Sequence, residues 1–217
     1  MKKSVYSLVL MDDVVSAIDD MAYQMNTSRS NLINQILAEH VSFITPERRM
    51  KDIFDCVRTI MDNHFQIQGQ ASEAMLSIRS PLRFKYKPTI RYRVELLREI
   101  KGKTFGRLSV SFRTQSVQLM EALESFFRVW YSIEKKYIGK YFENGIEYEY
   151  SDGKFIRNLK IAENHMESDI LGEAIGQYIR LLDTEIKIYF ANIDFPESAV
   201  VKMENLYNEH LQYMVII

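Results

Sequence analysis

The chain has 217 residues, 47% hydrophobic and 26% charged, with eight Gly and four Pro, which is typical of a globular protein with few long flexible linkers. No apolar run approaches the roughly 20 residues that cross a bilayer, so we expect neither a membrane span nor, from the start of the chain, a secretory signal. A single cysteine, Cys56, excludes an internal disulfide and makes a reducing cytoplasm the expected location.

The net charge of −1 hides an uneven distribution of charge along the chain. Residues 79–113 carry eleven basic and two acidic residues, a net of +9, whereas residues 141–217 carry six basic and fourteen acidic residues, a net of −8. A near-neutral protein therefore contains one concentrated basic segment, which is a candidate surface for an anionic partner.

The first segment with a clear period is Val5–Leu10, where alternation predicts a short strand. Asp12 or Asp13 is the expected N-cap of a following amphipathic helix, and Asn26 tolerates the left-handed backbone that ends such a helix. Ser28 is the expected N-cap of a second helix that continues to Val41. On the strand, the alternating faces are Tyr6, Leu8 and Leu10 on one side and Val5, Ser7 and Val9 on the other.

A strand followed by two helices is not expected to fold alone. Such a short unit buries little apolar surface, and a lone strand leaves its backbone N–H and C=O groups unpaired. Antiparallel pairing with the same strand of a second chain would complete the hydrogen bonds and cover the apolar face. The sequence therefore predicts a homodimer, with a dimer of dimers as a further option.

The whole segment from Val5 to Val41 resembles the ribbon-helix-helix family that includes Arc, MetJ and CopG. This resemblance implies that the paired strands enter the major groove of double-stranded DNA with Val5, Ser7 and Val9 facing the bases. It also implies that the start of the second helix anchors a phosphate, as free N–H groups and the helix dipole favour. The expected phosphate contacts are Ser28, Arg29 and Ser30, with Lys2 and Lys3 as further candidates.

The outward face of this strand differs from the family pattern. Family members usually display Arg, Lys, Asn, Gln or Thr there, whereas Val5, Ser7 and Val9 offer only methyl contacts and one hydroxyl. None makes the bidentate base contact that supplies about 1–3 kcal/mol of discrimination. An arm that serves only as a dimerisation handle is therefore a competing interpretation.

The middle of the chain is expected to be helical. Thr45-Pro46 breaks the second helix, Glu47 to His64 reads as another helix, and the polar residues of 66–80 indicate a linker or short helix. The expected domains are 1–45 as the DNA-binding and dimerisation arm, 46–80 as a helical connector, and 81–217 as a larger C-terminal domain.

Residues 81–217 are predicted to form an α+β domain of the order ββα-ββα-α. Alternation on both sides of Lys101-Gly102-Lys103 predicts one hairpin, and Ser151-Asp152-Gly153 separates the strands of a second. Helices are expected from about 117 to 137, from about 167 to 190, and from near Pro196. The buried stripe expected on the first of these helices is Val117, Met120, Leu123, Phe127, Trp130 and Tyr137.

The first hairpin places arginines on its polar face. Arg91, Arg93, Arg107 and Arg113 are candidates for a second basic surface that neutralises DNA phosphates. The competing interpretation is a solvated sheet face, or one paired internally with the acidic C-terminal segment.

Nothing in the sequence indicates catalysis, a metal or a cofactor. The four histidines and Cys56 lack metal-ligand spacing, and P-loop, dinucleotide-binding and nucleophile-elbow motifs are missing. Cys56 in an amphipathic helix is expected to be packing.

The sequence therefore predicts a sequence-specific, nucleoid-associated DNA-binding regulator, namely a transcriptional repressor or a plasmid or phage DNA-site binding protein. The alternative is an antitoxin-like or scaffold protein whose arm mainly dimerises the chain. In the regulator, the C-terminal domain is expected to add oligomerisation, a protein-partner surface or the binding of a small effector. In the alternative, it binds a protein partner.

Overall fold

The computed structural model describes residues 5–69, 72–84, 87–114, 116–151, 153–162 and 167–217. The chain divides into two compact units, Met1–Arg49 and Met50–Ile217. The predicted α+β class is confirmed, since helices accompany an antiparallel sheet.

The first unit holds two helices joined by a tight turn, as expected. Helix α1 (Asp12–Gln24) and helix α2 (Arg29–His40) flank Asn26, whose φ of +49° is left-handed. The expected cap of α1 was wrong, because Met11 holds that position without a side-chain hydrogen bond. Both aspartates lie inside the first turn instead, where their charge favours the positive end of the helix dipole.

Segment Val5–Leu10 has no regular secondary structure, and no strand of the described residues pairs with it. Its predicted place in a two-stranded ribbon therefore stays a prediction. A strand requires a partner for its hydrogen bonds, and the single chain supplies none to this segment.

The connection between α2 and helix α3 (Pro46–Ile60) differs from the expectation. Helix α2 ends at His40, and Ser42 has a left-handed φ of +55°. Pro46 begins α3 rather than ending α2, because proline is well suited to the first turn, where its missing N–H is not needed. Thr45 caps that turn by accepting a hydrogen bond from the Arg48 backbone N–H at 3.1 Å.

The second unit contains a six-stranded antiparallel sheet in the order β1-β2-β3-β4-β6-β5. The linker or short helix expected over 66–80 was wrong, because strands β1 and β2 lie there. Leu76, Ile78 and Ser80 are fully buried between half-buried neighbours, so β2 follows the period of a strand. The strands are β1 (Gln66–Ile67), β2 (Met75–Pro81), β3 (Thr89–Lys101), β4 (Thr104–Phe112), β5 (Tyr148–Ser151) and β6 (Lys154–Lys160).

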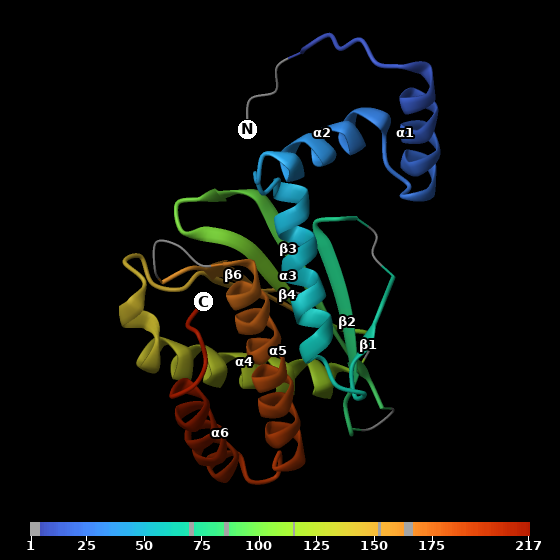
Figure 1. Ribbon diagram of the computed structural model, residues 1–217. Coiled ribbons are helices and arrows are strands. Elements are labelled where there is room, and N and C mark those ends of the chain that lie inside the picture. The colour runs from blue at the N-terminus through green and yellow to red at the C-terminus, as the bar shows by residue number, and fades with distance from the viewer. Residues whose placement is uncertain (1–4, 70–71, 85–86, 115, 152, 163–166) are drawn as a thin grey trace. The chain divides into compact units, whose positions relative to one another are not determined.

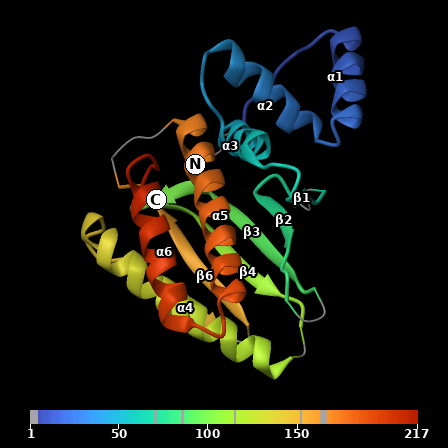
Figure 2. The ribbon, with the colours of Figure 1, turned by 90° about the horizontal axis from the view of Figure 1, so that it is seen from below.

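Both predicted hairpins are confirmed, with Gly102 in the left-handed turn between β3 and β4. Three further helices follow the sequence expectation closely: α4 (Val117–Tyr137), α5 (Ser168–Ala191) and α6 (Pro196–Leu211), with a short 3-10 helix η1 (Gly139–Tyr141) after α4. Helices α5 and α6 lie side by side (Figures 1 and 2).

The helices α4 and α5 pack on one face of the sheet. Tyr92, Val110 and Phe155 are cross-strand neighbours on that face. The Tyr92 hydroxyl donates to Asp183 of α5, and Phe155 stacks on Phe127 of α4 with ring centroids 4.4 Å apart. Figure 2 shows both helices lying along the same side of the strands.

The buried stripe of α4 is broader than expected. Val117 is 69% exposed and was wrongly included, whereas Phe126 is fully buried and was missed. The stripe is wide because α4 contacts both the sheet and its neighbouring helices; Phe126 stacks on Trp130 and meets Tyr189 of α5 edge-on.

Candidate nucleic-acid interface

The three expected base-facing residues lie in the segment that precedes α1, which has no regular secondary structure. Val5 is 99% exposed and Val9 is 102% exposed, and Ser7 is exposed as well. The opposite face is also uncovered, with Tyr6 at 84% and Leu8 at 61%. Every apolar side chain of this segment is therefore solvated in the single chain.

The start of α2 is organised as the sequence predicts. The Ser28 side chain accepts a hydrogen bond from the Asn31 backbone N–H at 3.3 Å, and Ser30 is exposed in the first turn. Arg29 forms a bidentate ion pair with Asp19 of α1, which raises the pKa of the arginine. This pair ties the two helices together and occupies the arginine expected to meet a phosphate. Lys2 and Lys3 lie outside the described residues.

The outer face of the sheet gathers three of the four predicted arginines. Arg91 lies opposite Ser111 and Arg93 opposite Ser109 across β3 and β4. Arg107 is in the same face but pairs with Glu95 at 3.1 Å, so part of the charge is neutralised within the hairpin rather than by the acidic C-terminal segment. Arg113 follows the end of β4 and is not part of the strand.

Sequence reasoning missed Arg79, which lies opposite Arg91 on the neighbouring strand β2. The signal was present, because Leu76 and Ile78 alternate with Ser77 and Arg79. The outer face therefore carries the half-buried Arg79, Arg91 and Arg93 on two adjacent strands, with serines opposite Arg91 and Arg93 on β2 and β4.

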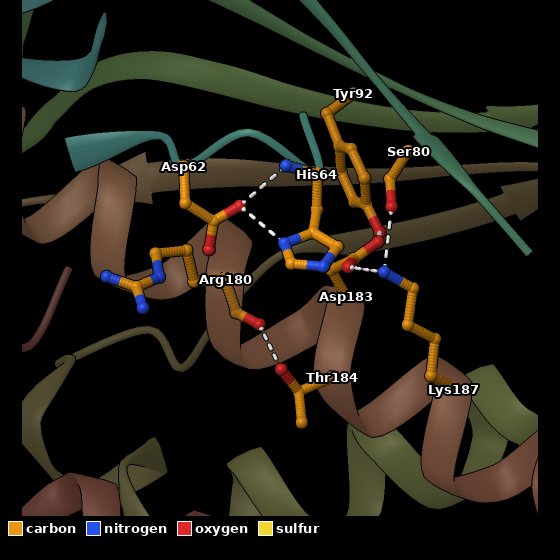
Figure 3. A network of polar contacts seen from close by, with 8 residues as sticks. All are labelled: Asp62, His64, Ser80, Tyr92, Arg180, Asp183, Thr184 and Lys187. Atoms are coloured by element: carbon orange, nitrogen blue, oxygen red, sulfur yellow. Dashed lines mark hydrogen bonds and ion pairs between the residues drawn. The ribbon is translucent and has the colours of Figure 1, made fainter. Parts of the chain in front are cut away.

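A second feature of the sheet unit is a cavity of about 520 Å³ beside α5. Apolar and charged groups share its wall, and Figure 3 shows most of the polar ones. The lining residues are Asp62, His64, Phe65, Pro81, Leu82, Arg83, Arg180, Asp183, Thr184, Lys187 and Ala191.

The floor of this cavity includes a connected series of polar contacts (Figure 3). Asp183, only 4% exposed, accepts hydrogen bonds from the Tyr92 hydroxyl at 2.9 Å and from Lys187 Nζ at 2.5 Å. Lys187 also donates to Ser80 Oγ at 3.0 Å. Burial, and then the neighbouring Asp183 charge, raise the pKa of Tyr92 well above its usual value, so this hydroxyl stays a donor.

At the cavity rim, the carboxylate of Asp62 contacts His64, two residues later in the chain. Its Oδ1 accepts from the His64 backbone N–H at 3.0 Å and lies 3.2 Å from His64 Nδ1. The His64 backbone N–H is the largest cause that lowers the pKa of Asp62, and the charge of Arg180 acts in the same direction.

A buried ion pair lies elsewhere in the core. Arg157 Nη2 is 3.3 Å from Glu134 Oε1, and both side chains are fully buried. The hydroxyls of Tyr148 and Tyr178 donate to Glu134 Oε2 at 2.5 and 3.1 Å. Burial raises the pKa of Glu134, although the Arg157 charge opposes that change. The cluster joins β5, β6, α4 and α5, and both members of its ion pair are fully buried, so we interpret it as structural.

Among the described residues, no group of three or more His, Cys, Asp or Glu side chains is placed to hold a metal ion. The Cys56 thiol donates to the Asp169 carbonyl at 3.3 Å, and burial raises the pKa of the thiol. A raised pKa keeps the thiol protonated and poorly nucleophilic. His165 lies outside the described residues.

Comparison with known proteins identifies no family for the chain. No family model, curated protein or solved structure matches the chain. In the part of the chain that the structure describes, no helix has both the length and the apolar character needed to cross a membrane.

Proposed function

We propose that the chain is a DNA-binding regulator that acts as a homodimer, with Val5–Leu10 of each copy paired in an antiparallel ribbon. The observation that carries this proposal is the exposed, largely apolar segment Val5–Leu10 before α1, which has no regular secondary structure. In the part of the chain that the structure describes, no strand pairs with this segment, and its side chains are exposed.

The shortage of buried apolar side chains in the first unit supports a second copy as the partner. Among its described residues, the buried hydrophobic side chains are those of Ala22, Leu32 and Ala38. A core of this size is too small for independent stability. Larger apolar side chains of the same unit are exposed instead: Tyr6, Leu8, Met21, Met25, Ile36, Leu37, Val41, Phe43 and Ile44.

A second copy of the chain would supply both a strand partner for Val5–Leu10 and cover for the exposed apolar side chains. Two identical strands related by a two-fold axis complete one another's hydrogen bonds, and the interface closes without leaving a free edge for further chains. The helices of both copies would then cover the face of Tyr6, Leu8 and Leu10.

DNA is the partner that this dimer would suit. A two-stranded ribbon fits the major groove, and the exposed start of α2 offers free N–H groups and a favourable dipole to a phosphate. The arginine face of the sheet supplies a further basic surface, and counterion release would make its contribution sensitive to salt.

Binding to a pool of random-sequence duplexes, combined with sedimentation equilibrium, tests the proposal. Val9→Glu places a negative charge on the expected DNA-facing side of the ribbon, so affinity should fall at least tenfold while the dimer persists. Val201→Glu is a matched control at an exposed valine of α6 and should change neither property. A monomeric chain, or equal affinities of both variants, would contradict the proposal.

Reversal of Arg91 and Arg93 to Glu tests the arginine face separately. If this face contacts phosphates, affinity should fall for all sequences alike and the salt dependence should weaken. Unchanged affinity would assign these arginines to a solvated sheet face.

The ion pair of Arg29 with Asp19 favours a second candidate function. An arginine already bound to a carboxylate is less available to a phosphate, and two of the three outward ribbon residues are valines. In this candidate, the arm only dimerises the chain and the larger unit binds a protein partner. A stable dimer that lacks affinity for the duplex pool would favour it.

A further inference from the structure

The cavity beside α5 has the size and composition of a small-molecule site. Its volume of about 520 Å³ lies within the roughly 300–1,000 Å³ typical of such sites. Phe65, Pro81, Leu82 and Ala191 supply apolar wall, while a few polar groups converge on the same space.

Two of the polar lining groups are already neutralised within the wall. Asp183 is held by Tyr92 and Lys187, so the carboxylate and the ammonium offset each other's charge. This network joins β2, β3 and α5, because Lys187 also reaches Ser80. A floor tied to three elements keeps its shape, which is a requirement for a site that orients a ligand.

Two guanidinium groups at the cavity have no ion pair within 4 Å among the described residues, although the charge of Arg180 acts on Asp62. Among the described residues, neither Arg83 nor Arg180 forms an ion pair, and both side chains belong to exposed residues of the lining. Counted together, the lining carries Arg83, Arg180 and Lys187 against Asp62 and Asp183, an excess of one positive charge among the arginines, lysines and aspartates.

The geometry points to a ligand class: we propose that this cavity binds a small organic anion, whose carboxylate or phosphate is held by Arg83 and Arg180. Arginine is suited to this role, since its planar fork matches either group with two parallel hydrogen bonds. The apolar part of the ligand would pack against Phe65 and Leu82.

The aromatic ring in the wall favours a ligand with a flat apolar body. Lys187 Nζ lies 5.9 Å from the centroid of the Phe65 ring, so one face of that ring is near a cation. An aryl group against the same ring gains apolar contact and a favourable offset or edge arrangement. An aryl phosphate and an aryl carboxylate are therefore the simplest probes.

Isothermal titration calorimetry of the full chain with phenyl phosphate and with phenylacetate tests the assignment. At least one probe should bind with a Kd below about 1 mM, and 2-phenylethanol and inorganic phosphate should bind at least tenfold more weakly. Which of the two anionic probes binds more tightly distinguishes a phosphate ligand from a carboxylate ligand. Changes in the amide resonances of Leu82 and Thr184 should place the bound probe in the cavity.

Variants at the cavity rim provide the decisive comparison. Arg83→Gln and Arg180→Gln should each weaken binding of the preferred probe at least tenfold, which corresponds to about 1.4 kcal/mol. Arg128→Gln is the matched control, because Arg128 is 79% exposed on α4 and does not line the cavity. Both rim positions are exposed, so an unchanged circular dichroism spectrum is expected for every variant.

Failure to bind either anionic probe would overturn the assignment. So would binding that the two rim variants leave unchanged, or resonance changes confined to other parts of the chain. Equal affinity for inorganic phosphate and phenyl phosphate would show that the apolar wall holds no ligand body. Ligand binding at this cavity does not depend on whether the chain binds DNA, so the two sets of tests can fail separately.

Discussion

Glu185 of α5 should make the stability of the sheet unit fall as the pH rises. Its side chain is fully buried, and among the described residues neither carboxylate oxygen has a hydrogen-bond partner. Burial raises the pKa of this carboxyl from about 4.5 to about 8. The carboxyl is therefore protonated in the folded chain at neutral pH, whereas in the unfolded chain it is ionised.

The direction and size of the effect follow from linkage between protonation and folding. A pKa that is higher in the folded chain gives a stabilisation that is complete below pH 4.5 and is lost as the pH rises through 8. The stabilisation lost between the two pKa values is roughly 5 kcal/mol, at 1.36 kcal/mol per pH unit. Glu185→Gln keeps a neutral group of similar size at all pH values, so this loss should disappear.

Urea unfolding, followed by the fluorescence of the buried Trp130, measures the effect between pH 4.5 and 8.5. The variant and the original chain should have similar unfolding free energies at pH 4.5, and the variant should be more stable by several kcal/mol at pH 8.5. Glu209→Gln is the control, because this glutamate is exposed on α6. Parallel stability curves for Glu185→Gln and the original chain would refute the reasoning.

Three other substitutions test the packing of the sheet unit. Arg157→Met should lower the unfolding free energy by about 3–5 kcal/mol, because it leaves Glu134 buried without its partner; adding Glu134→Leu should restore much of the loss in urea unfolding. Gly172→Ala would place a methyl carbon 2.5 Å from Cys56 Cβ, so calorimetry should show a destabilisation of about 1–3 kcal/mol. Ser116→Ala removes the N-cap of α4 and should cost about 1 kcal/mol in chemical unfolding. A neutral result for any of them would contradict the corresponding contact.

The helices of the first unit were predictable because their signals are local. Ser28 caps α2 through a hydrogen bond three residues away, and Asn26 takes the left-handed conformation that its short polar side chain tolerates. The strand expected at Val5–Leu10 is different in kind. A strand there would need a hydrogen-bonding partner that a single sequence does not specify, and the segment has no regular secondary structure in the chain.

The sequence carried only a weak signal for strand β2 and none for the cavity, which depends on tertiary packing. The alternation of Leu76 and Ile78 is short and is preceded by residues that favour turns, so its composition resembles a linker. The cavity combines Asp62 and Arg83 with Arg180 and Lys187, which are about one hundred residues later in the sequence. Only the packing of α5 against β2 and β3 brings these groups together.

The most direct test of the central claim is amide hydrogen exchange at residues 5–10, measured over a range of protein concentrations with and without duplex DNA. Pairing with a second copy predicts protection that rises with concentration, at the same midpoint as the increase in mass from monomer to dimer, and that increases further with DNA. Rapid, unprotected exchange of these amides at concentrations where the chain is fully dimeric would contradict the claim.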